Sequence, residues 1–347
     1  MLEVSDLSVR FDTDDGTVHA VDGMHFTLDQ GEVLGIVGES GCGKSVTCMS
    51  LVRLLPETAH ITGRAVFDGR DLLGLSPRAL RRVRGRDISF IFQEPMTSLN
   101  PVFTVGHQIM EVLVRHLGLS RRDAHARARE LLELVRIPAP ERRLHEYPHH
   151  LSGGMRQRVM IAIALACDPK GLVADEPTTA LDVTIQAGIL DLMRDIRERL
   201  GTAIILITHN LGVVADIADR VIVMYAGRKA EEAAVGELFA HPQHPYTLGL
   251  LGAVPRPYEG EGTRERLQEI PGRVPSLREL PQACAFADRC PRADERTRSE
   301  IPDLREVRPR HYVACFHPGG AEGDPVLRPG VGRLAADASS RGEANGN

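Results

Sequence analysis

Eight consecutive residues near the N-terminus have the types and spacing of a phosphate-binding loop. They are Gly38, Glu39, Ser40, Gly41, Cys42, Gly43, Lys44 and Ser45, and they match the pattern G-x-x-x-x-G-K-[ST]. The glycines of this pattern let backbone N–H groups turn inward around a phosphate. Lys44 would reach the β- and γ-phosphates, and the Ser45 hydroxyl would hold Mg²⁺. These residues therefore predict that the chain binds a nucleotide, with Mg²⁺ beside its phosphates.

The segments that flank this loop have the patterns of the elements that must position it. The apolar run 33–37 predicts a buried strand, and residues 44–55 predict a helix stopped by Pro56. A helix that starts directly after the loop adds unpaired N–H groups and the positive end of its dipole to the phosphate site.

Two acidic residues follow another predicted strand more than a hundred residues later. Asp175 and Glu176 close the apolar run 171–174, and the carboxyl ends of parallel strands are where ligands bind in open α/β sheets. Asp175 would hold Mg²⁺, and Glu176 would orient or deprotonate the attacking water. The alternative is a solvated acidic pair at a strand end, and the presence of a phosphate loop in the same chain disfavours it.

A second anion site is predicted where Leu151, Ser152, Gly153 and Gly154 open a helical stretch that runs to residue 166. Ser152 has the character of a helix N-cap, and the two glycines leave backbone N–H groups accessible. Taken alone, a pair of glycines at a helix start is often only a turn.

Composition limits the classes of function. The chain has 347 residues, a formal net charge of −5 and six cysteines, so bulk positive charge does not direct it to nucleic acid. No apolar run approaches the roughly 20 residues that span a bilayer, and the N-terminus lacks the pattern of a secretory signal. We expect a soluble, cytosolic chain without disulfides, whose role at a membrane depends on a partner.

The order of these motifs resembles the ATP-binding subunit of an ABC transporter, over residues 1 to about 235. The resemblance implies an α/β fold: a phosphate-loop ABC ATPase core with a helical subdomain at about 94–155, plus a small irregular C-terminal domain. We expect the ATPase domain at 1–235, the C-terminal domain at 236–318 and a disordered tail at 319–347. Along the chain, residues 1–30 have a hairpin-like pattern around Asp14–Gly16, residues 104–136 and about 183–200 have helical patterns, and the apolar run 203–207 predicts another strand. Strands that alternate with helices agree with a mostly parallel sheet.

The same resemblance implies roles for further residues. Gln93 matches the Gln loop that contacts Mg²⁺ and the attacking water, and His209 matches the histidine that touches the γ-phosphate. Asp182, at the end of Ala180–Leu181–Asp182, matches a dimer-contact loop. Two subunits of the family form a head-to-tail dimer, in which Ser152, Gly153 and Gly154 of one subunit meet the nucleotide of the other. Phe11 is the candidate for stacking on adenine, with packing in the core as the alternative.

Two further segments resemble the oligopeptide, dipeptide and nickel importers. They are Gln93–Pro101 and His244–Thr247. Some members of this branch ligate a [4Fe–4S] cluster with four cysteines. Cys284, Cys290 and Cys315 match three of the positions, but Thr297 stands where the fourth is expected, and a hydroxyl is a poor iron ligand. His311 or His317 could substitute. We favour the alternative, three reduced thiols without a cluster.

The implied function is that of the ATP-hydrolysing motor of a membrane importer for dipeptides or oligopeptides, peripheral to the cytoplasmic face of the membrane. Its expected partners are two transmembrane permease subunits, a second ABC ATPase of different sequence and, indirectly, an extracytoplasmic solute-binding protein; no nucleic acid is expected. One alternative is import of nickel or another small solute. Another is a soluble ABC ATPase that acts on ribosomes or DNA, which the single phosphate loop and the lack of sustained heptads disfavour.

Overall fold

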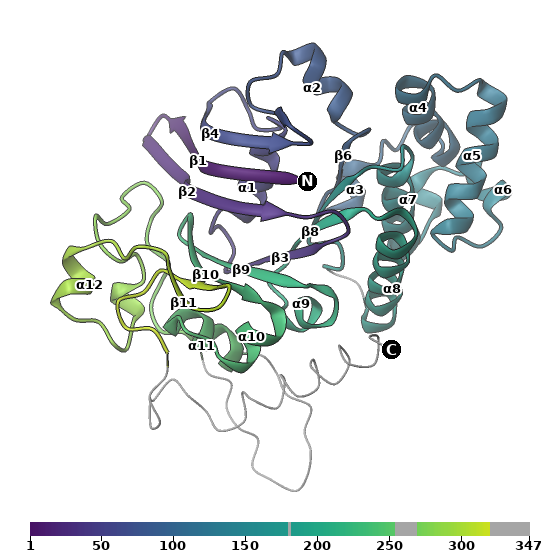
Figure 1. Cartoon of the computed structure of the whole chain (residues 1–347). Helices are drawn as coiled ribbons and strands as arrows, with labels where there is room; N and C mark the ends of the chain where they lie inside the picture. The colour runs from purple at the N-terminus through teal and green to yellow at the C-terminus, as the bar shows by residue number, and fades with distance from the viewer. Residues whose placement is uncertain (180–181, 254–268, 320–347) are drawn as a thin grey trace, which may run out of the picture. The chain divides into compact units, whose positions relative to one another are not determined.

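The computed structural model describes residues 1–179, 182–253 and 269–319, which form two compact units (Figure 1). The first unit comprises Met1–Leu2, Thr27–Val33 and Val66–Ile207. The second comprises Glu3–Phe26, Leu34–Ala65 and the described residues from Thr208 onward. Ala180, Leu181 and the expected tail beyond Gly319 lie outside the described residues.

The second unit opens with a long β-hairpin. β1 (Leu2–Thr13) and β2 (Gly16–Leu28) pair on either side of a turn at Asp14 and Asp15, and β4 (Ala59–Phe67) pairs with the other edge of β1. Along β1, buried residues such as Leu7 and Val9 alternate with more exposed ones, as expected for a strand with one face on the core. The hairpin predicted from the sequence is confirmed.

A second sheet of the same unit supports the phosphate loop. β3 (Val33–Val37) pairs in parallel with β9 (Arg220–Tyr225), and β10 (Arg228–Ala234) pairs antiparallel with β9. Two short C-terminal strands, β12 (His311–Val313) and β11 (Arg305–Arg308), extend this sheet beyond β10. All five residues of β3 are buried, which confirms the predicted strand ahead of the loop.

The helix after the phosphate loop is shorter than its sequence pattern predicts. α1 covers Lys44–Leu51, not 44–55. Arg53 takes a left-handed backbone with φ +53°, and the N–H of Leu54 bonds back to the carbonyl of Met49 at 2.9 Å. This is the hydrogen-bond pattern of a helix C-terminus, so the helix ends before Pro56 can act. The other helices of the unit are α9 (Leu211–Ile217), α10 (Val235–Ala240), α11 (Pro245–Gly252) and α12 (Glu295–Ser299).

The first unit contains three parallel strands, β6 (Ile88–Ile91), β7 (Gly171–Asp175) and β8 (Ala203–Ile207). β7 is central: Gly171 aligns with Ile88 on one side and with Ala203 on the other. All residues of β7 and β8 are buried, as expected for parallel strands covered on both faces. The unit also holds β5 (Arg70–Asp71) and α2 (Pro77–Val83). The predicted strands 171–174 and 203–207 are confirmed.

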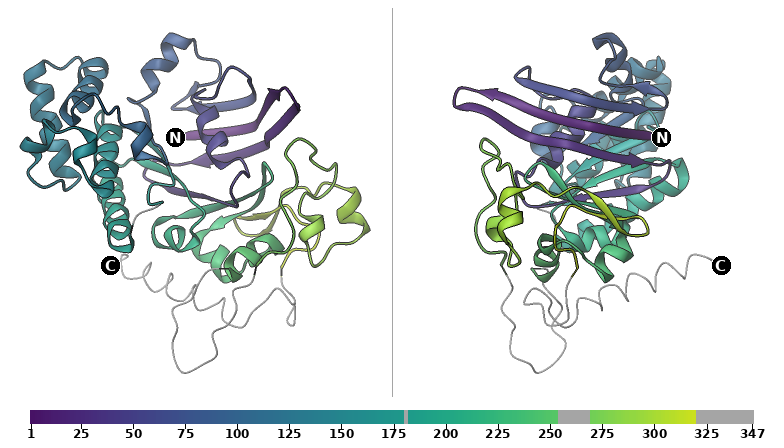
Figure 2. Two further views of the ribbon diagram at one scale, coloured as in Figure 1. Left: turned by 180° about the vertical axis from the view of Figure 1, so that it is seen from behind. Right: turned by 60° about the vertical axis from the view of Figure 1, so that its left-hand side comes forward.

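Helices form the rest of the first unit. The expected helical region after Gln93 contains α3 (Pro95–Ser98), α4 (Val105–Leu117), α5 (Arg121–Leu134) and α6 (Pro140–Leu144), and α4, α5 and α6 pack together and against α7 (Gly153–Leu165) (Figure 2). Gly118 ends α4 with φ +68°, and the Ser120 hydroxyl caps α5, so the continuous pattern 104–136 becomes two helices. α8 (Val183–Leu200) has the bounds that the sequence predicts. No helix among the described residues has a stretch long and apolar enough to cross a membrane.

Candidate functional site: a phosphate loop and a carboxylate at a strand end

The phosphate loop is held in shape by Lys44 before any ligand is considered. The Lys44 side chain is buried, and its Nζ donates to the carbonyl oxygens of Gly38 at 2.8 Å and Glu39 at 2.9 Å. Gly38 has φ +152° and Gly43 has φ +100°. A Cβ at either position would stand 2.3 Å from a backbone oxygen, so only glycine fits there. The loop therefore closes around its own lysine, and the predicted reach of Lys44 to the β- and γ-phosphates stays a prediction.

The middle of the loop is open to solvent, whereas its end is packed. Ser40 and Gly41 are exposed, and Ser45 is half-buried in the first turn of α1. Cys42 is buried, and its carbonyl accepts from the Gly227 N–H at 3.0 Å. Burial raises the pKa of the Cys42 thiol, so this cysteine stays protonated and fills space. The exposed segment is the part that can take an anion on its N–H groups.

His209 lies in the same unit, on a turn fixed to the strand that leads into the loop. The N–H of Thr208 donates to the carbonyl of Ile36 in β3 at 3.2 Å. Asn210 caps α9, and its own N–H bonds to the Thr208 hydroxyl at 3.0 Å. These two neighbours fix the backbone, while the His209 side chain is exposed. An exposed histidine on a fixed turn is placed to meet a ligand.

In the first unit the structure brings Gln93 and Glu176 together. Gln93 Nε2 donates to Glu176 Oε2 at 3.1 Å, and the Thr179 hydroxyl donates to the same oxygen at 2.7 Å. Glu176 has a left-handed backbone with φ +46°, and its N–H bonds to Ile207 O at 2.9 Å. Unusual backbone at a charged residue is typical of functional sites. The residue before it, Asp175, ends β7 with a buried side chain.

Thr179 is a residue that the sequence reasoning missed. Its hydroxyl donates to the carboxylate of Glu176, three residues earlier in the same turn. A hydroxyl three residues after an acidic residue at a strand end is a weak signal, because threonines commonly bond to nearby backbone instead. Together, Gln93 and Thr179 hold the charged carboxylate in one orientation.

The predicted second anion site is the N-terminus of α7, which lies beside the N-terminus of α8. The Ser152 hydroxyl caps α7 by accepting from the Met155 N–H at 3.4 Å, and Asp182 caps α8 by accepting from the Ile185 N–H at 2.9 Å. A Cβ on Gly154 would lie 2.9 Å from the Ile185 side chain. A glycine is therefore required where α7 approaches α8. Ser152 and Gly153 are exposed.

Phe11 lies in β1 and is half-buried. This agrees equally with stacking on adenine and with partial packing, so its role stays a prediction.

The residues near the three C-terminal cysteines do not fit a four-thiolate cluster. Thr297 is buried, and its hydroxyl both accepts from the Asp294 N–H at 2.8 Å and donates to Asp294 O at 2.7 Å, which makes a capping box for α12. His311 and His317 are bound to the carboxylates of Glu231 and Asp294.

The pKa values of these thiols agree. Burial raises the pKa of Cys284, and it raises the pKa of Cys315 to about 11. Both sulfurs therefore stay protonated near neutral pH in the metal-free chain, and a metal would have to displace those protons to bind.

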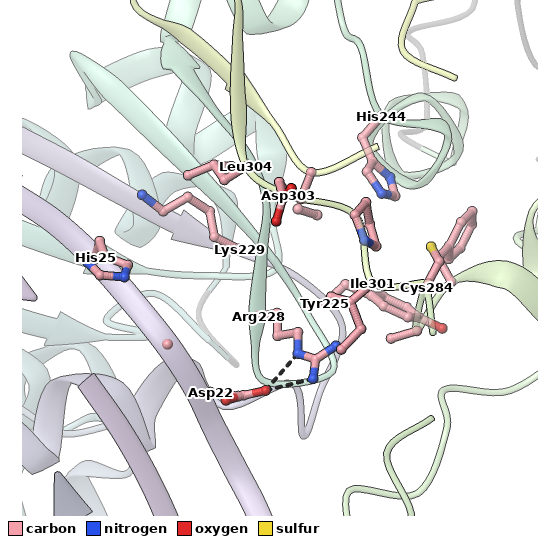
Figure 3. Close-up of a pocket in the computed structure, with 16 residues that line it drawn as sticks. Asp22, His25, Tyr225, Arg228, Lys229, His244, Cys284, Ile301, Asp303 and Leu304 are labelled. Atoms are coloured by element: carbon pink, nitrogen blue, oxygen red, sulfur yellow. Dashed lines mark hydrogen bonds and ion pairs between the residues drawn. The ribbon is translucent and has the colours of Figure 1, made fainter. Parts of the chain in front are cut away.

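The His244–Thr247 segment caps a helix next to a pocket of about 360 Å³ (Figure 3). His244 Nδ1 accepts from the Tyr246 N–H at 3.0 Å, and Pro245 is the first residue of α11. Burial lowers the pKa of His244 to about 4, so the ring is neutral and can accept. Figure 3 shows Arg228 directed to Asp22 at the other side of this pocket, at 2.7 Å. The His244–Thr247 segment thus has a structural role as the start and cap of α11.

Comparisons with known proteins agree with the fold and the motifs. Residues 21–179 match the family model "ABC transporter", and residues 230–296 match "Oligopeptide/dipeptide transporter, C-terminal region". The chain is 51% identical to the oligopeptide transport ATP-binding protein OppD of Salmonella typhimurium, over 92% of this chain and 94% of the relative. It is also 51% identical to OppD of Bacillus subtilis, over 94% and 91%.

A solved structure of an ATP-binding cassette, in a dimeric post-hydrolysis state bound to ADP and Pi, matches with a TM-score of 0.62 and 27% identity, over 68% of this chain and 99% of that one. Fold and motifs thus define an ABC-type ATPase, and the predicted fold class is confirmed. The chain belongs to the ATP-binding proteins of ABC transporters, in the group that carries the oligopeptide/dipeptide C-terminal region. The phosphate-loop and carboxylate motifs thus belong to an enzyme that uses ATP and Mg²⁺.

Proposed function

We propose that the chain is the ATP-hydrolysing motor of a peptide importer. The observation that carries the catalytic part is the Glu176 carboxylate, held at 3.1 Å by Gln93 and at 2.7 Å by Thr179 at the end of a buried strand. The peptide cargo is supported by relatives that are named for oligopeptide transport. These names favour peptides over nickel, and the C-terminal region favours a transporter over an ATPase that acts on ribosomes or DNA.

Each site residue has one proposed task. Lys44 and the loop N–H groups would bind the phosphates of ATP, His209 would contact the γ-phosphate, and Phe11 would stack on adenine. Glu176 would accept a proton from the attacking water, because a fixed carboxylate at hydrogen-bond reach of water acts as a general base. Mg²⁺, held by Ser45, Asp175 and Gln93, would supply charge neutralisation at the phosphates. Most of the catalysis is then positioning and electrostatics.

We propose a head-to-tail dimer with a second ABC ATPase of different sequence. The exposed N-terminus of α7, with Ser152 and Gly153, would present its N–H groups to the nucleotide on the partner. Asp182 would lie in the contact between the subunits. Hydrolysis would remove the γ-phosphate contacts that hold the two subunits together, and the dimer would open.

The proposed membrane partners are two transmembrane permease subunits at the cytoplasmic face, with a solute-binding protein acting outside. Apolar side chains near Gln93 support such a contact: Phe92 is 38% exposed, Val102 70% and Phe103 42%. Phe103 also stacks on His107, with 4.6 Å between the ring centroids. Exposed large apolar side chains of this kind are typical of an interaction site.

The proposed domain limits are an ATPase domain at 1–235, with its helical subdomain at about 94–155, and a C-terminal domain at 236–318. The family-model match that begins at residue 230 supports the division.

The experiment is to purify the tagged chain from its native membranes and to identify the proteins that co-purify by mass spectrometry. Two multi-span proteins and a second ATPase are expected, and ATP hydrolysis by the reconstituted complex should rise when peptide and its binding protein are added. Recovery of ribosomal or DNA-repair proteins alone, with none of the chain in membranes, would contradict the transporter.

A further inference from the structure

Glu39, the second residue of the phosphate loop, is held from two sides by the C-terminal part of the chain. Its N–H donates to the Tyr246 hydroxyl at 2.8 Å. Its carboxylate receives two hydrogen bonds from Arg289, at 2.6 Å from Nη1 and 2.9 Å from Nη2. The partners lie 207 and 250 residues further along the chain, so this contact joins the appended region directly to the nucleotide loop.

Arg289 is built into a site that aims its guanidinium at the loop. The side chain is 4% exposed, and its Nε donates to Pro271 O at 2.9 Å. The guanidinium lies over the rings of Tyr225 and Phe286, at 5.7 and 5.9 Å from their centroids. A buried arginine needs a charged partner, and the planar fork matches a carboxylate in two-point geometry. Glu39 is that partner.

Tyr246 is equally fixed. Its side chain is fully buried, and its ring packs edge-on against Tyr225 at 4.7 Å. Burial raises the pKa of its hydroxyl, so the group remains neutral and accepts the Glu39 N–H. Removing only this oxygen would leave a part-buried N–H without its acceptor.

Glu39 also touches the residue that would bind phosphate. Its carbonyl oxygen accepts from Lys44 Nζ at 2.9 Å. A shift of Glu39 therefore displaces the lysine and the N–H groups between them. Preorganised donors bind an anion more tightly because no ordering cost remains.

We propose that Arg289 and Tyr246 are positioning residues of the ATPase, which set the affinity of the phosphate loop for nucleotide by holding Glu39. The proposal rests on the proposed role of the loop in ATP binding. It makes the C-terminal domain a part of the nucleotide site.

The test compares Glu39→Gln, Arg289→Lys and Tyr246→Phe in the full-length chain. Each substitution changes the hydrogen-bonding group with little change in the shape of the side chain, and Glu39 is half-buried. The dissociation constant for MgATP is measured with the purified chain, and KM and kcat with the reconstituted complex. Arg298→Lys is the matched control, because Arg298 pairs with Asp288 on the exposed surface of the same domain.

Each of the three variants should raise the dissociation constant and KM about tenfold, which corresponds to roughly 1.4 kcal/mol. kcat at saturating ATP should stay within about twofold, because Glu176 is unchanged. The double variant Glu39→Gln with Arg289→Lys should have a dissociation constant for MgATP no higher than that of the single variant that binds MgATP more weakly, because both changes break the same interaction. A purely structural pair would instead lower the unfolding midpoint and leave the dissociation constant unchanged, which would overturn the proposal.

Lys44→Ala distinguishes failure of the positioning role of Arg289 and Tyr246 from failure of ATP binding by the loop. If Lys44→Ala weakens MgATP binding and the three variants do not, the positioning role is wrong and the loop assignment stands. If Lys44→Ala binds MgATP normally, the loop assignment fails first.

Discussion

Glu176 combines a left-handed backbone with two hydrogen bonds to one carboxylate oxygen. A non-glycine residue keeps such a backbone only when its surroundings impose it. Here the N–H bond to Ile207 and the bond from Thr179 N–H to the Glu176 carbonyl fix the turn. The carboxylate is thus held in place before a substrate arrives.

Glu176→Gln should lower kcat for ATP hydrolysis by about a hundredfold or more, because the amide keeps the shape but cannot accept the proton. ATP binding should be retained. Steady-state hydrolysis and nucleotide binding are measured on the same preparation. Glu198→Gln, on the exposed face of α8, is the control. Normal turnover in Glu176→Gln would remove Glu176 from the role of base.

Thr179→Val tests the orientation of the same carboxylate. The loss of one 2.7 Å hydrogen bond should reduce kcat about tenfold with little change in KM, since the bond acts on the base and not on ATP. Thr179→Ser keeps the hydroxyl and should restore most of the rate. Equal kinetics of the Val and Ser variants would show that Thr179 does not orient Glu176.

At the scale of elements, the sequence predicted the strands best. The buried runs 33–37 and 203–207 have the predicted bounds because parallel strands covered on both faces are continuously apolar. Helix ends were less predictable. α1 stops at Leu51 because Arg53 adopts a left-handed backbone, and an arginine gives no local sign of that.

Thr297 has a structural role at the start of α12, where it forms a capping box with Asp294. Thr297→Ala removes the hydroxyl that Asp294 uses twice and should destabilise the C-terminal domain by about 1 kcal/mol. Thr297→Ser should retain most of the stability. Urea unfolding followed by circular dichroism provides the measurement, since the chain has no tryptophan. An unchanged midpoint for Thr297→Ala would mean that the cap is dispensable.

The same residue bears on iron. With a buried hydroxyl at the fourth position, already hydrogen-bonded to Asp294, we expect protein prepared without oxygen to contain no stoichiometric iron. Metal analysis and the visible spectrum of anaerobic protein measure this. One cluster per chain would contradict the expectation and would require another ligand.

At the scale of the whole molecule, most contacts between distant segments could not be predicted from the sequence. Gln93 and Glu176 were each predicted from motifs, and their hydrogen bond follows from parallel strands that end at one edge. The hydrogen bonds that join Arg289 and Tyr246 to Glu39 were not predicted. Tyr246 belongs to the His244–Thr247 segment that the sequence singles out, but neither Tyr246 nor Arg289 gives a local sign of the distant loop residue that it contacts.

Stability should depend on pH through His311. Burial alone would lower the pKa of His311, but its hydrogen bonds to Glu231 and Glu237 outweigh burial and raise that pKa above 6.5. Between the two pKa values the imidazole of His311 binds more protons in the folded chain than in the unfolded chain. Its contribution to stability is therefore complete below pH 6.5 and is lost as the pH rises through the raised pKa.

His311→Gln should therefore flatten the fall in unfolding free energy between pH 6 and pH 9. Urea unfolding at fixed ionic strength measures the slope, and His317→Gln, at an exposed pair, is the control. The same slope in His311→Gln and in the original chain would assign the pH dependence to other groups.

The buried carboxylate of Glu231 receives three donors, from Gln243 N at 2.7 Å, His244 N at 2.9 Å and His311 Nε2 at 2.7 Å. All three come from the region after β10, and β12 covers the edge of β10 itself. A chain shortened at residue 235 to resemble a minimal cassette would keep the charge of Glu231, lose all its donors and expose a strand edge ready to pair with other molecules. We therefore expect the shortened chain to aggregate, because the appended region supplies both the donors of a buried carboxylate and the partner of an edge strand.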